Sequence, residues 1–279
     1  SYFKIESYRE GQMKRAELHH HGRLSLRSHC FEIALWIFSP LPTQGAVKQA
    51  RLAFEVEPLE PASPAKALIM SHIGQILLEI GMEAESRDYL HRSLEMSQHF
   101  ASVESIVDVS LGLSRYFEFQ GDLEQAEAHG RRALDFDVAL AVTRDVMRLQ
   151  LGRVLFMRGA LEEGHRLLKE LAFLDLPRVA HLYDYTMAWA KLQEERYEDA
   201  LRHTHEVRRK ARLLPPGPVF AYGADFLELK ALLGLGRHEL GLKKAQQLVK
   251  SADRPAFSAT APLARLTESV QYPVGFYVG

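Results

Sequence analysis

A pattern of small side chains recurs along this chain at intervals of roughly 40 residues, a period typical of stacked helical repeats. In the first three intervals the small residues are separated by 12 and then 7 positions, and in the next two by 12 positions. Only a small side chain lets two helix backbones approach closely, so these offsets suit two antiparallel helices that cross. The pattern therefore predicts an all-α fold, a solenoid of about six antiparallel helix hairpins. The repeated positions are Ala34, Ala46, Ala53, Gly74, Ser86, Ser93, Ser114, Ala126, Ala133, Gly152, Gly164, Ala188, Ala200 and Gly241.

The boundaries of the predicted hairpins follow from the same register. Residues 1–26 form a lead-in, residues 27–253 the repeat domain, and residues 254–279 a capping helix followed by an aromatic tail. The tail is either a flexible end or a segment that docks on the solenoid or on a neighbouring molecule. We expect the hairpins to begin near Arg27, Ala67, Val107, Asp145, His181 and Tyr222.

Proline and glycine mark the expected ends of the predicted helices. Prolines in the segment 57–64, at Pro177 and in the segment 214–218 are expected to separate hairpins, because proline cannot continue a helix. Glycines are expected in the turns inside the hairpins, because glycine adopts the left-handed conformation that often ends a helix. These glycines are Gly81, Gly121, Gly159 and Gly236.

Composition excludes several classes of protein. The 35 basic and 36 acidic side chains give a formal net charge of −1, which excludes disorder and a strongly basic nucleic-acid binder as descriptions of the whole chain. No apolar stretch reaches the roughly 18 residues of a membrane span, and no signal-peptide pattern follows Ser1. The single Cys30 cannot form an intramolecular disulfide and favours a reducing cytoplasm. We expect a cytoplasmic segment of a longer protein.

The residue counts also bear on the source of the chain. There is no Asn, and Arg outnumbers Lys by 24 to 11. Depletion of thermolabile residues is typical of thermophiles, and GC-rich coding would equally favour Arg. These counts predict a bacterial, thermophilic source.

The sequence motifs of catalysis and cofactor binding are missing. The chain contains no GxxxxGK[ST], GxGxxG, HExxH, CxxC or GxSxG. His203 and His205 are two positions apart and would point in different directions from a helix, as expected for a solvated face. The run His19–His21 could bind a metal only incidentally. We expect no enzyme activity, no cofactor and no dedicated metal site.

Charge is unevenly distributed along the chain. Residues 1–140 carry 14 basic and 20 acidic side chains, a balance of −6, and residues 141–279 carry 21 and 16, a balance of +5. Opposite charge on the two halves could promote head-to-tail association. A basic cluster between Arg202 and Arg212 could contact phosphates, but it lacks interleaved aromatic residues and suits a helix C-terminus. We therefore interpret it as a solvated face.

With this register, residues 27–253 resemble the tetratricopeptide repeat family, whose usual period is shorter, at about 34 residues. The family has small residues at the eighth, twentieth and twenty-seventh repeat positions and proline near the thirty-second. The first hairpin matches with Ala34, Ala46, Ala53 and Pro58, and the third with Ser114, Gly121, Ala126 and Ala133. The longer period is similar to that of the sensor arrays of large bacterial transcriptional activators. Leu171, Val207 and Leu248 depart from the small-residue pattern.

The resemblance implies a right-handed superhelical solenoid in which the first helix of each hairpin lines a concave binding surface. Arginine or lysine could there bind a carboxylate or phosphate while aromatic rings hold an apolar group. The alternative is that the aromatic side chains belong to the core. The family's peptide-carboxylate clamp usually relies on Asn, which is absent here. The candidate residues are Arg115, Glu118, Phe119, Arg153, Phe156, Tyr185, Trp189, Phe226 and Lys230.

Three functional classes are compatible with these observations. The first is a non-catalytic solenoid that binds a protein, a peptide or a small effector, as the sensory or interaction segment of a bacterial transcriptional regulator. Nucleic acid would then be contacted only through a neighbouring domain. The second is an assembly scaffold that mediates protein–protein contacts or self-association without a small ligand. The third is an enzyme, or an accessory domain of one, with an unrecognised site.

Overall fold

The computed structural model describes residues 52–54, 57–59, 61–79, 82–136, 141–211 and 218–252, and all regular structure within these ranges is helical. A short 3-10 helix, η1 (Glu57–Leu59), precedes five consecutive pairs of α-helices. The predicted lead-in, the small residues of the first hairpin before Ala53, and the tail 254–279 lie outside the described residues. The pairs are α4 (Pro64–Glu79) with α5 (Glu83–His99), α6 (Val103–Gln120) with α7 (Leu123–Leu134), α8 (Ala141–Met157) with α9 (Leu161–Lys169), α10 (Pro177–Gln193) with α11 (Tyr197–Ala211), and α12 (Pro218–Gly234) with α13 (His238–Ala252).

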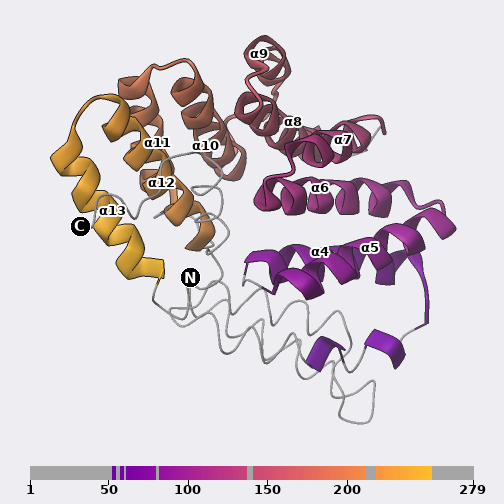
Figure 1. The fold of residues 1–279 in the computed structure, drawn as a ribbon. Coiled ribbons are helices and arrows are strands. Elements are labelled where there is room, and N and C mark those ends of the chain that lie inside the picture. The colour runs from indigo at the N-terminus through magenta and orange to yellow at the C-terminus, as the bar shows by residue number, and fades with distance from the viewer. Residues whose placement is uncertain are drawn as a thin grey trace, which may run out of the picture.

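The five pairs follow one another along an arc, with α4 and α5 at one end and α12 and α13 at the other (Figure 1). Each first helix packs against the first helix of the next pair, whereas each second helix packs mainly against first helices. In the view of Figure 1 the first helices accordingly lie on the inner side of the arc. The described part of the chain is therefore an all-α array of helix pairs, as the sequence predicted.

The predicted small residues lie where the two helices of a pair cross. Ser86 on α5 donates from Oγ to the carbonyl of Gly74 on α4 at 2.8 Å, and Ser114 on α6 donates to the carbonyl of Ala126 on α7 at 2.8 Å. A Cβ added at Gly164 on α9 would come within 2.5 Å of the Phe156 ring on α8. At these crossings the backbones are so close that one helix hydrogen-bonds to, or packs directly on, the main chain of the other.

The prolines lie at the boundaries between hairpins, as the sequence predicted. Helices α4, α10 and α12 begin at Pro64, Pro177 and Pro218, so each of these residues also starts the first helix of the next hairpin. Proline suits the first helical turn because its fixed φ is helical and the N–H that it lacks would have no partner there. Each described pair begins slightly before its predicted start, including the two pairs whose first helices begin at Val103 and Ala141 without a proline.

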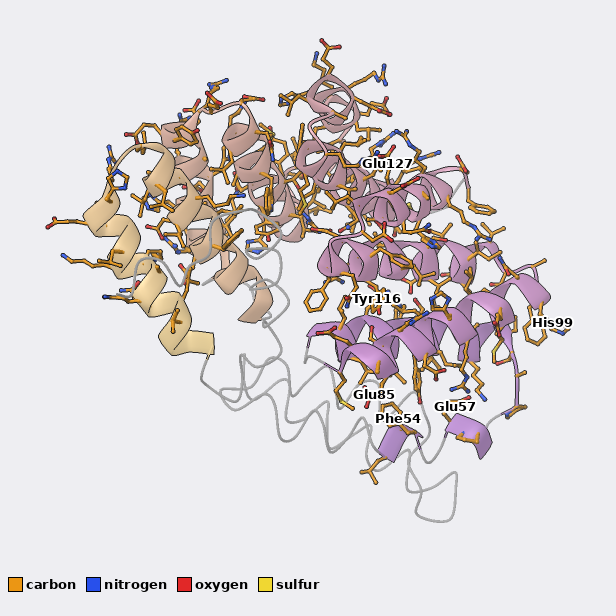
Figure 2. All side chains as sticks on the ribbon, viewed as in Figure 1. Phe54, Glu57, Glu85, His99, Tyr116 and Glu127 are labelled. Carbon is orange, nitrogen blue, oxygen red and sulfur yellow. The ribbon has the colours of Figure 1, made fainter. Side chains whose placement is uncertain are left out.

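Side chains fill the spaces between successive helices (Figure 2). At the α4–α5 end, Phe54 packs on Tyr89 with ring centroids 5.3 Å apart. The buried carboxylate of Glu57 forms ion pairs with Lys66 at 2.7 Å and with Arg92 at 2.5 Å. Glu57 thereby ties η1 to both helices of the first described pair.

Candidate functional site: a polar and aromatic row along the first helices

The first helices share a row of polar and aromatic side chains that contact one another from pair to pair. The row begins on α4, where the Gln75 amide nitrogen donates to Asp108 Oδ2 on α6 at 3.1 Å. Gln75 Oε1 in turn accepts a 3.3 Å hydrogen bond from Arg115, also on α6. His72 Nε2 lies 3.4 Å from Asp108 Oδ1. Gln75 and Arg115, which belong to successive helix pairs, thus meet directly. We call the whole set the first-helix row: Gln75, Asp108, Arg115, Glu118, Gln150, Arg153, Tyr185, Trp189, Phe226 and Lys230.

The middle of the row is a charged network between α6 and α8. Arg153 donates from Nε to Glu118 Oε1 and from Nη2 to Glu118 Oε2, both at 2.7 Å. Gln150 donates to Glu118 and accepts from Arg153, each at 2.5 Å. Burial disfavours the charge of Arg153, but its attraction to Glu118 is stronger and raises the pKa of the guanidinium. Both charges are therefore compensated inside the protein.

The network continues into α10 through Tyr185. The Arg153 guanidinium lies 5.2 Å from the centre of the Tyr185 ring, within the range of a cation–π interaction. Burial raises the pKa of the Tyr185 hydroxyl, although the charge of Arg153 opposes this. On the next helix, a Cβ at Gly223 would come within 2.5 Å of the Tyr185 hydroxyl oxygen. Glycine at this position of α12 lets the tyrosine reach the neighbouring backbone.

The row ends in an aromatic pair beside Lys230. The rings of Trp189 on α10 and Phe226 on α12 lie 6.4 Å apart. Lys230 Nζ lies 5.3 Å from the centre of the Trp189 ring and 5.6 Å from that of Phe226. Burial lowers the pKa of this ammonium group. Lys230 is thus a partly buried cation held over two aromatic faces.

The structure brings most of the predicted candidates together but changes what they can do. Phe156 is fully buried under Gly164, so it belongs to the core and cannot line a surface. Phe119 packs partly on the core cluster around Leu113. Tyr185, Trp189 and Phe226 are buried, so their rings serve mainly as packing, in agreement with the core alternative.

The sequence missed Gln150, which completes the Glu118–Arg153 network. Gln150 is a buried polar residue three positions before Arg153, so the two face the same direction on α8. That spacing was visible in the sequence. The tetratricopeptide register, however, did not assign position 150 to the inner face.

The histidines and the basic cluster have specific partners. His203 Nδ1 lies 2.9 Å from Asp184 Oδ1, and Asp184 also accepts from Lys210. Although burial opposes it, hydrogen bonding from His203 and Lys210 lowers the pKa of Asp184. Arg208 pairs with Asp225 and Glu228 on α12. The prediction of a wholly solvated basic face was therefore incomplete, because part of the cluster ties α11 to its neighbours.

The remaining predicted features concern metals and membranes. Across the described ranges, no three His, Cys, Asp or Glu side chains gather as a potential metal site. Within the same ranges, no helix combines the length and the apolar character needed to cross a membrane. His19–His21 and Cys30 lie outside the described residues.

Comparison with known proteins adds no family assignment. No protein-family model matches the chain, and the search of curated proteins found no significant match. The tetratricopeptide resemblance therefore stays a prediction.

Proposed function

We propose that this chain is a non-catalytic, tetratricopeptide-like solenoid that binds a protein, a peptide or a small effector along its first helices. The observation that carries the proposal is the first-helix row, whose side chains interact across every boundary between described pairs. Because the side chains of the row contact one another, a ligand bound to one hairpin would change the side-chain contacts of the next hairpin. In the wider proposal, the chain is the cytoplasmic sensory or interaction segment of a bacterial transcriptional regulator, with right-handed superhelical stacking.

A thermal-shift screen against metabolites and peptides tests this proposal. A true ligand should raise the melting temperature of the wild-type chain by mass action. Two row variants, Gln75→Ala and Lys230→Met, should reduce this shift. Two matched variants of exposed residues on second helices, Arg166→Ala and Lys243→Met, should not. A ligand whose effect depends on the second helices and not on the row would overturn the proposal.

One observation favours the alternative of a self-associating scaffold. Helix α13 exposes Leu240, Leu242 and Val249, with Leu240 50% exposed. Apolar side chains at one end of an array suit contact with a second copy, and the opposite charges of the two halves of the sequence favour a head-to-tail arrangement. Sedimentation over a range of concentrations tests this function. Self-association should weaken in Leu240→Glu and should persist in the matched variant Leu174→Glu, at an exposed leucine outside α13.

A further inference from the structure

Lys230 differs from the other lysines that are buried or partly buried in the described residues because it has no counter-ion among them. Lys66 pairs with Glu57, Lys191 with Glu194 and Lys244 with Glu228, at 2.6 to 2.7 Å. Around Lys230 the described contacts are instead the rings of Trp189 and Phe226. A partly buried ammonium with three donors and no oxygen acceptor in the described part of the chain is unusual, because buried charges are normally paired.

The aromatic rings compensate this charge only in part. A cation–π contact attracts an ammonium group electrostatically, but it does not replace the hydrogen bonds that the group makes in water. In keeping with this, burial lowers the pKa of Lys230, and no carboxylate of the described residues opposes the effect. A ligand oxygen at this position would gain a charge-assisted hydrogen bond in a poorly hydrated environment.

The rest of the row limits the ligand to one negative charge at this end. Arg153 is the nearest cation along the row, and both of its hydrogen bonds to Glu118 are already formed. Of these two cations of the described row, a dianion or an acidic peptide would therefore find only Lys230 without a carboxylate partner. The side chains that the structure places against this ammonium group are aromatic, since Lys230 Nζ lies 5.3 Å from the centre of the Trp189 ring and 5.6 Å from that of Phe226.

We propose that Lys230 binds the carboxylate of a small monocarboxylic acid whose apolar or aromatic portion lies beside Trp189 and Phe226. This inference rests on the proposed function, because it takes the first-helix row as the ligand-binding face. It adds the chemical class of the ligand and the residue that recognises its charge. Arg153 holds the row together, and Lys230 remains for the ligand.

Fluorescence of Trp189 tests the inference directly. The chain has two tryptophans, so a Trp36→Phe background leaves Trp189, which contacts Lys230, as the only indole reporter. The probes are phenylacetate, its neutral isostere phenylacetamide, inorganic phosphate and an acidic hexapeptide of Asp and Glu. Phenylacetate should give a saturable change and should bind ~10-fold or more tightly than each other probe.

Substitutions then assign the effect to Lys230. Lys230→Met keeps the methylene stem without the charge and should weaken phenylacetate binding ~10-fold or more, while leaving the weak binding of phenylacetamide unchanged. The control variant Lys243→Met removes the same charge from an exposed lysine of α13. It should leave the affinities for phenylacetate and for phenylacetamide unchanged. Lysine NMR gives a second readout, since bound phenylacetate should raise the depressed pKa of Lys230.

Several results would overturn the inference. These are equal binding of the acid and the amide, unchanged phenylacetate binding in Lys230→Met, absence of any saturable response to phenylacetate, or tighter binding of the acidic peptide. The proposed function would survive each of them if the thermal-shift screen still found a ligand that depends on Gln75. Both proposals fail together if no ligand depends on any residue of the row.

Discussion

Arg153 donates two hydrogen bonds of 2.7 Å to Glu118, which lies on the first helix of the preceding pair. Both side chains are largely buried, with 8% and 13% of their surfaces exposed. The pair joins α6 to α8 in the middle of the array. It was predicted as a ligand-binding element, and the structure shows that each charge already has its partner.

Removal of Glu118 should be strongly destabilising. Glu118→Ala leaves the guanidinium of Arg153 buried without its carboxylate, and breaking such a pair costs about 3–5 kcal/mol. Urea unfolding at pH 7 measures the loss. In the double variant Glu118→Leu with Arg153→Met, part of the stability should return, because no unpaired charge remains.

The control for this prediction is an exposed pair. Glu206→Ala removes the partner of Arg209 on the surface of α11, and it should leave the free energy of unfolding almost unchanged. If Glu118→Ala proves as stable as Glu206→Ala, the network does not hold α6 and α8 together.

The turn of the α10–α11 pair is a site for stabilisation. Gly121, Gly159 and Gly236 end the first helices of three other pairs with φ of 79°, 82° and 68°, whereas Glu195 occupies the matching place with φ of 57°. A side chain in the left-handed region costs roughly 1–2 kcal/mol relative to glycine. Glu195→Gly should therefore raise the free energy of unfolding by about 1 kcal/mol, measured by urea denaturation. The control Glu162→Gly, in the first turn of α9, should instead lower the free energy of unfolding. A loss of stability in Glu195→Gly would contradict the prediction.

Close packing of helix pairs predicts opposite results for two glycine substitutions. A Cβ at Gly164 would meet three ring atoms of the buried Phe156 within 2.9 Å, so Gly164→Ala should cost about 1–3 kcal/mol by overpacking. At Gly241 the nearest atom is the exposed tip of Leu233, at 3.0 Å, which can move. Gly241→Ala should be neutral or stabilise by up to about 1 kcal/mol through helix propensity. Thermal unfolding of the two variants measures the difference, and equal effects would contradict it.

The sequence was sufficient to predict the helical architecture, because small residues at crossings and glycines in turns constrain the backbone directly. Ser86 and Ser114 were found as small residues, and in the structure they also hydrogen-bond across the crossing. The candidate site was less predictable. A helical register places Arg153 and Lys230 on one face. It does not show that Glu118, held by Gln150, neutralises the charge of Arg153, whereas Lys230 contacts aromatic rings. Such pairing depends on side chains from different helices, which periodicity along one helix does not encode.

Burial of His129 should make stability depend on pH near 6. Its ring stacks on Phe117 at 5.4 Å, and its buried Nδ1 has no hydrogen-bond partner among the described residues. Burial, assisted by Arg132, lowers the pKa of His129 below its usual 6.5. The unfolded chain then binds a proton first as the pH falls, so stability is full above pH 6.5 and declines below it. Urea unfolding between pH 7 and 5 should show a smaller decline in His129→Leu than in the wild type, whereas the exposed His205→Leu should follow the wild type.

Lys230 should make stability depend on pH in the alkaline range, whereas His129 does so in the acidic range. Its pKa in the folded chain lies below the usual 10.5, so the folded chain loses this proton before the unfolded chain does. The wild type therefore carries the full cost of burying the charge at pH 7, and the cost falls as the pH rises through the folded pKa toward 10.5. The stability of Lys230→Met minus that of the wild type should decrease between pH 8 and 10.5 in urea unfolding. For Lys243→Met the same difference should stay flat, and an increase for Lys230→Met would mean that a carboxylate already pairs with Lys230 in the free protein.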